Sequence, residues 1–270
     1  MPDVLRVATA NAAGGRDRTG AAGAAQWEGW AAAAATLDVD VLGVQEVDHL
    51  LPRSGAVDQT TALAAALAVG EPWESRFAAA VHGTPGSAAT FRAALASPAD
   101  EPSYGVALLS RHPVRRWAEL RLPPSRARLP VLLPPGADRG VLWVPDEPRV
   151  ALAAVVAAPA GDVTVVTTHL SFGPWRAVPQ LWEVMRWARD LPAPRVLLGD
   201  LNLPGRLAAG VSGWTPALRA PTYPASAPRV QLDHVLVDGP TSVRSATTRT
   251  VGHSDHLALR AELVVARGGA

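Results

Sequence analysis

Short apolar runs recur along the whole chain, and many end in Gly, Pro or a polar side chain. Their length and their content of Val, Leu and Thr are typical of β-strands. They predict strands at residues 4–11, 39–47, 73–81, 105–111, 149–158, 163–170, 195–202, 231–238, 242–251 and 256–265. The run from Val163 to Val166 further indicates a strand that is covered on both faces.

Helical spacing of apolar residues lies between some of these runs. It predicts helices from Trp27 to Leu37, from Gln59 to Val69 and from Pro179 to Asp190. Strands with interspersed helices favour an α/β fold in which helices flank two central sheets. The stretch from Leu122 to Pro148 is rich in Pro and Arg, has weak periodicity and predicts a long surface excursion. With no internal repeat and no linker, residues 1–270 are expected to form a single domain.

Composition narrows the class of protein. The chain has 270 residues, 48% of them hydrophobic, which is enough for a large core. The net charge is +1, so the molecule as a whole is not a general binder of polyanions. Without cysteine, disulfides and thiolate zinc sites are excluded. We find neither a signal peptide nor a segment long enough to span a membrane, so we expect a cytoplasmic protein.

Polar side chains follow or open several of the predicted strands. Polar groups embedded in apolar strands are costly unless they are paired or bind something. The set contains carboxylates, carboxamides and imidazoles but no thiol, which suits a hard cation such as Mg²⁺ or Mn²⁺. Its members are Asn11, Gln45, Glu46, His169, Asp200, Asn202, Asp233, His234, Ser254, Asp255 and His256.

Each of these residues also has a purely structural explanation. The Gly-Asp-x-Asn segment at Asp200 is most often a turn or a helix N-cap. Glu46 fits a solvated residue just past a strand, and His169 fits a hydrogen-bonded structural histidine. Asp233 and His234 fit a strand in which one residue faces outwards. These explanations do not account for the recurrence of such residues at successive strands.

The order of the polar segments resembles that of the endonuclease/exonuclease/phosphatase superfamily. The matching segments are Asn11, "QE" at Gln45, "THL" ending at Leu170, "GDLN", "LDH" and "SDH". "YGVALLSRHPV" from Tyr104 and "EPRVAL" from Glu147 resemble further family segments, and the similarity extends from Val4 to about Val265. The resemblance implies a deoxyribonuclease I-like fold, which is a four-layer α/β/β/α sandwich, and a metal-dependent phosphoesterase.

The resemblance also implies roles for the polar residues. Glu46 would be the main Mg²⁺ ligand, with Mn²⁺ as a substitute. Asn11 would share the metal site or orient Glu46 or the phosphate, and Asp255 would add a contact through water. Asp200 would align or deprotonate the attacking water, and Asn202 would hold that water or a phosphate oxygen. Asp233 would fix the tautomer of His256, which would bind a phosphate oxygen or act in acid–base catalysis, and His169 would assist the phosphate or the leaving group.

The substrate is left open by the sequence. A small or lipid-linked phosphate ester is one alternative, DNA or RNA is a second, and a non-catalytic binding module with the same fold is a third. Arginines at Arg111, Arg115, Arg116, Arg121, Arg126 and Arg128 fit either a strip for nucleic acid or a solvated face. Most of the tryptophans are expected to pack in the core. A zinc site at His253 and His256 is a minor alternative, and the oligomeric state is open.

Overall fold

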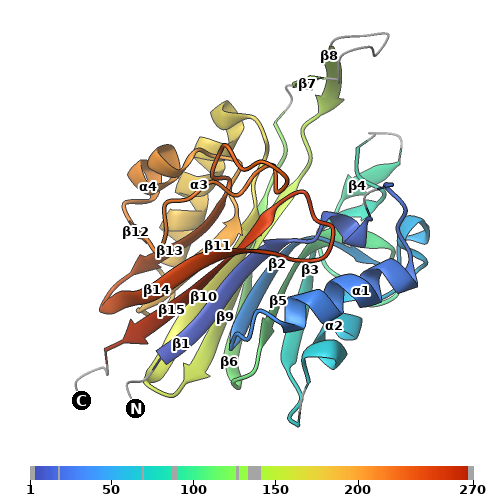
Figure 1. The fold of residues 1–270 in the computed structure, drawn as a ribbon. Helices are drawn as coiled ribbons and strands as arrows, with labels where there is room; N and C mark the ends of the chain where they lie inside the picture. Colours follow the sequence, from blue (N-terminus) through green and yellow to red (C-terminus); the bar gives the residue numbers. More distant parts are fainter. Residues whose placement is uncertain are drawn as a thin grey trace.

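Two β-sheets lie face to face in the middle of the molecule, and each carries helices on its outer face (Figure 1). The computed structural model describes residues 4–17, 19–68, 70–86, 90–125, 128–132 and 141–266, with only the backbone described at 128–132 and 141–142. The four-layer α/β/β/α sandwich implied by the resemblance is therefore confirmed. Branched aliphatic side chains such as Val7, Val165 and Leu198 fill the space between the sheets.

The first sheet has seven strands and the second has six. In spatial order, the first consists of β14 (Thr241–Thr250), β15 (Leu257–Val265), β1 (Val4–Asn11), β2 (Val41–His49), β5 (Ser103–Ser110), β3 (Glu74–Gly83) and β4 (Phe91–Ala93). The second consists of β12 (Thr215–Pro216), β13 (Asp233–Asp238), β11 (Arg195–Asp200), β10 (Gly161–His169), β9 (Arg149–Ala158) and β6 (Val114–Leu122). Only the neighbours β1–β2 and β10–β11 run parallel in the described part of these sheets.

Helices cover the outer faces of the two sheets. On the first sheet, α1 (Ala24–Ala35) and α2 (Gln59–Leu67) bury Trp27, Trp30 and Leu63. On the second, α3 (Pro174–Ala188) and α4 (Gly205–Ser212) bury Leu181 and Val184 among others. Two short 3₁₀ helices, η1 (Ala13–Gly15) and η2 (Pro52–Ser54), follow β1 and β2. None of the helices in the described ranges is long and apolar enough to cross a membrane.

All ten strand-like runs of the sequence form strands, but some helix bounds differ from the predicted ones. The third helix begins at Pro174 rather than at Pro179, because a proline in the first helical turn leaves no intrahelical hydrogen bond unmade. The first helix covers Ala24–Ala35, since its alanines give little periodic contrast to mark an end. Strand β6 was missed because it lies at a sheet edge, where exposed arginines interrupt the apolar pattern.

The predicted surface excursion is confirmed where the structure describes it. Strands β7 (Arg128–Leu132) and β8 (Val141–Pro145) form a separate two-stranded hairpin that projects beyond the sandwich (Figure 1). Most of the tryptophans pack against the core, as expected, but three do not. Trp175 and Trp182 on α3 are each more than half exposed, because α3 turns Leu181 and Val184 towards the sheet instead, and Trp143 on the projecting β8 is also more than half exposed.

Candidate active site

The register of the strands brings distant polar residues to one edge of the sandwich. Asn11 at the end of β1 pairs with Gln45 on the parallel strand β2. In the other sheet, His169 at the end of β10 pairs with Asp200 at the end of β11, and Asp200 pairs with Asp233 at the start of β13. Because the two sheets face each other, Glu46 beside Gln45 in one sheet and His169 and Asp200 in the other line a single cleft.

A bulge in β2 sends the two residues of the "QE" segment in opposite directions. The pairing of β2 with β5 is interrupted between Val44 and Val47, and Glu46 has a positive φ of 55°. The Gln45 side chain is fully buried, where it accepts a hydrogen bond from Thr9 Oγ1 and donates one to Thr167 Oγ1 of the other sheet. Gln45 therefore anchors the bulge, and Glu46 alone faces the cleft.

Asn11 links the two sheets at the floor of the cleft. Its amide nitrogen donates to Glu46 Oε1 at 3.1 Å and to Asp200 Oδ2 at 3.0 Å. Its side-chain oxygen Oδ1 accepts from the backbone N–H of Ala13 at 2.9 Å. In this arrangement Asn11 positions two carboxylates, and its role as a metal ligand stays a prediction.

Asp200 is a buried carboxylate with a strongly perturbed pKa. Its side chain also accepts a hydrogen bond from the backbone N–H of Asn202 at 3.0 Å. Burial and the nearby charge of Asp233 raise the pKa of Asp200 from 3.8 to about 7, although His256 and the hydrogen bonds from Asn11 and Asn202 oppose the rise. A carboxylate with this pKa exchanges protons near neutral pH, as a general base must.

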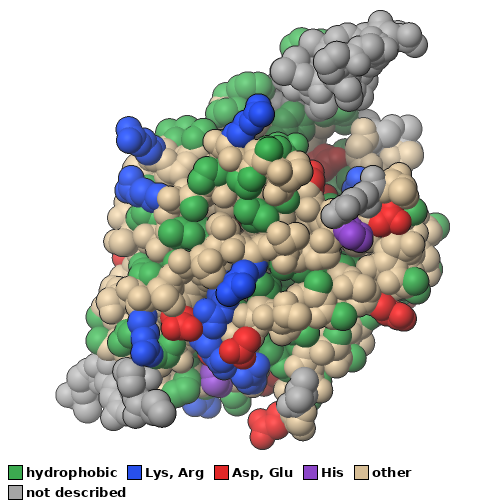
Figure 2. Space-filling view, viewed as in Figure 1, with side chains coloured by type: hydrophobic (Ala, Val, Ile, Leu, Met, Phe, Trp, Pro, Cys, Tyr) green, Lys and Arg blue, Asp and Glu red, His purple; other side chains and the backbone are tan. Residues whose placement is uncertain are grey.

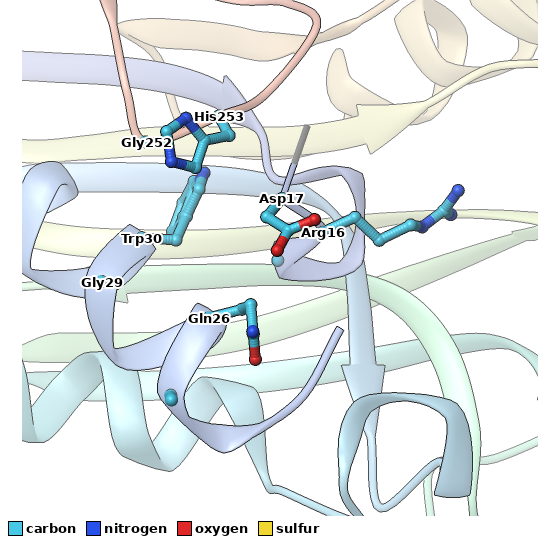
Figure 3. Close-up of a pocket in the computed structure, with 9 residues that line it drawn as sticks. Arg16, Asp17, Gln26, Gly29, Trp30, Gly252 and His253 are labelled. Carbon is cyan, nitrogen blue, oxygen red and sulfur yellow. The ribbon is translucent and has the colours of Figure 1, made fainter. Parts of the chain in front are cut away.

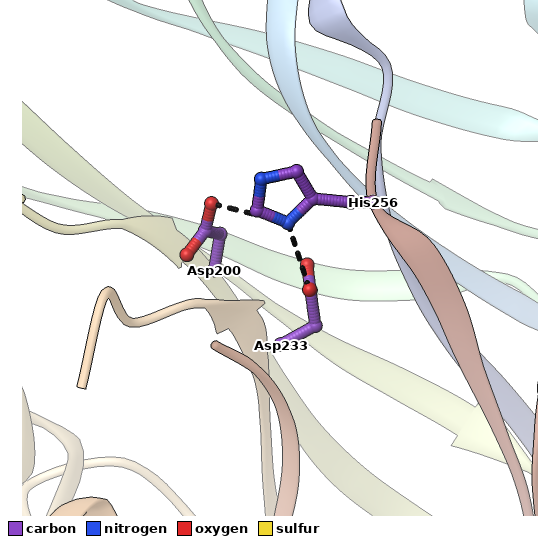
Figure 4. Close-up of side chains that lie close together, drawn as sticks. All are labelled: Asp200, Asp233 and His256. Carbon is purple, nitrogen blue, oxygen red and sulfur yellow. Dashed lines mark hydrogen bonds and ion pairs between the residues drawn. The ribbon is translucent and has the colours of Figure 1, made fainter. Parts of the chain in front are cut away.

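His256 is held between carboxylates (Figure 4). Its Nδ1 lies 2.8 Å from Asp233 Oδ2 and 3.7 Å from Asp200 Oδ2. The Tyr223 ring packs on the imidazole at a centroid distance of 4.8 Å. Burial alone would lower the pKa of His256, but the hydrogen bond with Asp233 and the charges of Asp200, Asp233 and Asp255 raise it to about 10. The ring is thus an imidazolium at neutral pH, and Asp233 occupies its Nδ1.

His169, whose Nε2 lies 3.6 Å from Asp200 Oδ2, has the reverse electrostatics. Its two ring nitrogens face Arg149 Nη1 at 3.4 Å and Asn202 Nδ2 at 3.2 Å. Burial and the positive charges of Arg149 and His256 lower the pKa of His169 well below its usual value, so the ring is neutral. The Asn202 amide nitrogen also donates to the carbonyl of Leu170 at 3.0 Å, and its side-chain oxygen makes no hydrogen bond to the described residues.

The cleft has a volume of about 540 Å³, and Asp255 lies exposed at its rim. Several residues that line it were not singled out from the sequence: Arg16, Arg53, Tyr104, Arg149 and Tyr223. Tyr104 and Arg149 lie within the two segments quoted above for their resemblance, and that signal could have identified them. Arg16 and Tyr223 lie outside the named strands and helices and Arg53 lies in the three-residue η2, so none of them belongs to a periodic pattern.

Arg149 is the most unusual of these residues. It is only 6% exposed, yet its Nε has no hydrogen-bond partner in the described part of the chain. Its terminal nitrogens make only long contacts, to His169 and, at 3.5 Å, to Glu147. By contrast, Nη2 and Nε of Arg53 donate hydrogen bonds to the carboxylate of Asp48 at 2.7 and 2.9 Å. A buried guanidinium with unused donors beside a cleft is suited to bind an anion.

The donor set fits a divalent cation at Glu46. Oε2 of Glu46 has only Arg16, at 3.9 Å, as a charged partner among the described residues. Further carboxylates of Glu147, Asp200 and Asp255 line the same cleft. Oxygen ligands of this kind suit Mg²⁺ or Mn²⁺. The clustered atoms of Asp200, Asp233 and His256 lie within 4.8 Å of one another, but the hydrogen bond between His256 and Asp233 occupies the nitrogen that would be needed as a ligand.

The minor alternative of a zinc site finds no support. His253 is exposed, and the group of clustered ligands found among the described residues does not include it. His234 also lies apart from the cleft, with its Nε2 2.9 Å from the carbonyl of Leu203. His234 therefore has a structural contact of its own.

Three of the arginines for which a nucleic-acid strip and a solvated face were the alternatives are ion-paired in the described residues, and Arg116 is exposed. Arg111 pairs with Asp40, Arg115 with Asp162 and Arg121 with Glu119. None of these three arginines lines the cleft. The face shown in Figure 2 likewise carries arginines in small groups with acidic side chains beside several of them. The side chains of Arg126 and Arg128 lie outside the described residues.

Comparisons with known proteins agree with this fold. The sequence profile described as "Endonuclease/Exonuclease/phosphatase family" matches residues 8–256. A protein of that description from Beutenbergia cavernae has 21% identity and a TM-score of 0.68, over 98% of this chain and 72% of the other. The mannosyl-6-phosphatase Bt3783 of Bacteroides thetaiotaomicron has 18% identity and a TM-score of 0.59, over 96% and 99%. Truncated TDP2 of Caenorhabditis elegans has 15% identity and a TM-score of 0.57, over 97% of this chain and 98% of the other. No curated protein sequence matches the chain.

Proposed function

This chain belongs to the endonuclease/exonuclease/phosphatase family, whose members hydrolyse phosphoester bonds, and we propose that it is a Mg²⁺-dependent phosphoesterase acting by in-line attack of water. The observation that supports this function most directly is the pair Asp200 and His256. One is a carboxylate with a pKa of about 7 and the other an imidazolium with a pKa of about 10, in the same cleft. Two groups with such separated pKa values suit acid–base work on one substrate.

Asp200 would act as the general base. Asn11 and the backbone of Asn202 hold its carboxylate in place, and the free oxygen of Asn202 would accept a hydrogen bond from the attacking water. Asp200 would take a proton from that water as its oxygen attacks phosphorus, while the bond from phosphorus to the ester oxygen breaks and the proton passes on to the alcohol that leaves. Because the amide nitrogen of Asn202 is already used, this geometry favours the water rather than a phosphate oxygen as the partner of Asn202.

Positive donors would stabilise the charge on the phosphoryl oxygens. His256 would donate from Nε2, since Asp233 holds its Nδ1. Arg149 would donate from the opposite wall, and His169 would stay neutral beside it. Phosphoryl transfer requires mainly such positioning and charge stabilisation. A divalent cation at Glu46 would neutralise charge on the phosphate and make the phosphorus more electrophilic.

The test is hydrolysis of p-nitrophenyl phosphate and of bis-p-nitrophenyl phosphate, with Mg²⁺, with Mn²⁺ and with EDTA. We expect metal-dependent release of p-nitrophenol, and at least ~10²-fold slower turnover for Asp200→Ala and for His256→Ala. His253→Ala is the matched control, because this exposed histidine lies three positions from His256 and does not line the cleft. Full activity in EDTA, or wild-type turnover in both alanine variants, would contradict the proposal.

A further inference from the structure

Part of the catalytic cleft is lined by side chains that can neither form hydrogen bonds nor carry charge. These are Val144, Pro145 and Phe172, which we call the apolar wall. Phe172 is 37% exposed, and Val144 and Pro145 are half-buried. Exposed apolar surface inside a concave site is typical of ligand binding, because a ligand that covers it releases the water from it. The apolar wall is therefore a candidate binding surface.

A buried hydrogen-bond network holds the two parts of the apolar wall together. Asp146 Oδ1 accepts a hydrogen bond from Ser171 Oγ at 2.6 Å, so the residues just before Asp146 lie beside Phe172. The backbone N–H of Ser171 donates to Gln180 Oε1 of α3 at 2.9 Å. Asp146, Ser171 and Gln180 are all buried, and buried polar contacts are costly to break. The backbone that carries Phe172 is thus fixed, although its side chain is exposed.

The apolar wall lies within reach of the residues that would bind the phosphate. Phe172 follows His169 by three positions, so their Cα atoms are at most about 11 Å apart. Pro145 precedes Arg149 by four positions, which limits that separation to about 14 Å. All four residues line the same cleft as His256. A phosphate bound by Arg149 and His256 can therefore carry an esterified group that lies on the apolar wall.

An apolar group suits this wall better than a sugar or a nucleobase does. The three side chains of the wall offer no donor or acceptor, so a hydroxyl or a base edge against them would lose hydrogen bonds to water without replacement. An alkyl or aryl group loses none, and its burial is favourable. The pocket of about 330 Å³ beside α1 is the opposite case, because Arg16, Asp17, Gln26 and His253 contribute polar groups to its lining (Figure 3).

We propose that the apolar wall binds the esterified group and that the substrate is a phosphate ester of an apolar alcohol, an inference that rests on the proposed function. Phe172 is then a residue that determines specificity, since its ring contacts the esterified group while Arg149 and His256 bind the phosphate. In the reaction, the oxygen of water bonds to phosphorus and the bond from phosphorus to the alcohol oxygen breaks. The apolar alcohol leaves with a proton.

The first experiment measures selectivity for chain length. Ethyl, butyl and hexyl phosphate have leaving alcohols of nearly equal reactivity, so differences in kcat/KM report the binding of the chain. We expect kcat/KM to rise by up to about fourfold for each added methylene group that is buried. Phe172→Ala should lower the ratio of kcat/KM for hexyl over ethyl phosphate by about tenfold, and Phe172→Leu should keep most of it. Equal kcat/KM for the three esters would overturn the proposal.

Trp182→Ala is the matched control, because Trp182 is an exposed aromatic residue of α3 that does not line the cleft. This variant should keep the wild-type ratio of hexyl to ethyl phosphate. An equal loss of the ratio in Trp182→Ala and Phe172→Ala would contradict the role of Phe172. Glucose 6-phosphate and a dinucleotide are the competing substrates, and a higher kcat/KM for either of them than for hexyl phosphate would also overturn the proposal.

The second experiment measures binding without hydrolysis. The chain has three phenylalanines, and Phe172→Leu identifies the ¹⁹F signal of Phe172 in protein labelled with 4-fluorophenylalanine. Hexylphosphonate, whose P–C bond is not hydrolysed, is titrated in the presence of Mg²⁺, with 2-hydroxyethylphosphonate as the polar control. We expect a saturable shift of the Phe172 signal at a concentration of hexylphosphonate at least about tenfold below that needed for the control. No shift, or an equal response to both probes, would refute the inference.

The two experiments separate this inference from the proposed function. If no phosphate ester is hydrolysed but the Phe172 signal responds selectively to hexylphosphonate, the proposed chemistry is wrong and the apolar wall is a binding surface. If p-nitrophenyl phosphate is hydrolysed but Phe172→Ala keeps the wild-type ratio of hexyl to ethyl phosphate, the apolar wall does not determine specificity and the chemistry stands.

Discussion

Replacement of Asp200 by Asn should stabilise the metal-free protein at alkaline pH. The carboxylate of Asp200 is almost fully buried next to that of Asp233, and its pKa is raised from 3.8 to about 7. An acid whose pKa is raised in the folded state opposes folding once it ionises, because the unfolded chain holds the charge at lower cost. Asn removes this charge while it keeps the shape of the side chain.

The magnitude follows from the two pKa values. The difference between 3.8 and about 7 corresponds to roughly 4 kcal/mol at any pH well above 7. Against this, an NH₂ group in place of one oxygen loses the hydrogen bond from either Asn11 or the backbone N–H of Asn202. Such a loss costs roughly 1–2 kcal/mol. The variant should therefore gain roughly 2 kcal/mol at pH 8 or above.

The sign of the effect should reverse in acid. Ionisation of Asp200 does not destabilise the folded protein below the unfolded pKa of about 4. The destabilisation grows as the pH rises towards 7 and is constant above pH 7. Near pH 4 only the lost hydrogen bond remains, so the variant should be less stable than wild type by roughly 1 kcal/mol. Urea denaturation in EDTA at pH 4, 6 and 8, followed by tryptophan fluorescence, measures this difference.

Asp255→Asn is the matched control, because this carboxylate lies exposed at the rim of the same cleft. Its substitution should change the stability little at any of the three pH values. If the Asp200→Asn variant lost as much stability at pH 8 as at pH 4, the ionised carboxylate of Asp200 would not destabilise the folded protein.

Three further predictions concern the other titratable and charged groups. Asp233→Asn should lower the pKa of His256 from about 10, measured by NMR titration of the ring, because it removes the hydrogen-bonded carboxylate; an unchanged pKa would refute the pairing. Arg149→Lys should raise KM for p-nitrophenyl phosphate by roughly tenfold with a smaller effect on kcat, since a single ammonium cannot replace the guanidinium fork; equal KM values would exclude Arg149 from binding. The pKa of His169 is lowered in the folded protein, so wild-type stability should fall as the pH drops below about 6.5, where the unfolded chain binds a proton at this histidine and the folded chain does not. In urea titrations, His169→Gln should flatten this dependence of stability on pH.

Local patterns were sufficient for most of the strands. Runs such as Val4–Asn11 and Arg149–Ala158 are mostly apolar because both faces of these strands are buried along most of their length. The pattern fails where that burial is incomplete, as in β6 at the sheet edge. Helix ends were less certain, since the alanines of α1 and the two prolines of α3 blur the boundary signal.

The polar residues at the strand ends were also visible in the sequence, but their partners were not. Asn11 and Asp200 are 189 positions apart, and their hydrogen bond exists only because the two sheets stack. Likewise, "QE" looks like one functional pair, yet the bulge in β2 buries Gln45 between the sheets and leaves Glu46 in the cleft. The positive φ of Glu46 carries no signature in the residue type.

The sequence by itself determined the strands, the order of the polar segments and hence the family, because alternation, burial and chain order are properties of neighbouring residues. Only the tertiary structure decided which atoms meet: that the Asn11 amide nitrogen donates to both Glu46 and Asp200, and that Arg149 keeps unused donors at the cleft. Such contacts depend on how the sheets and loops pack across large sequence separations, and no local pattern encodes the direction of a side chain after that packing.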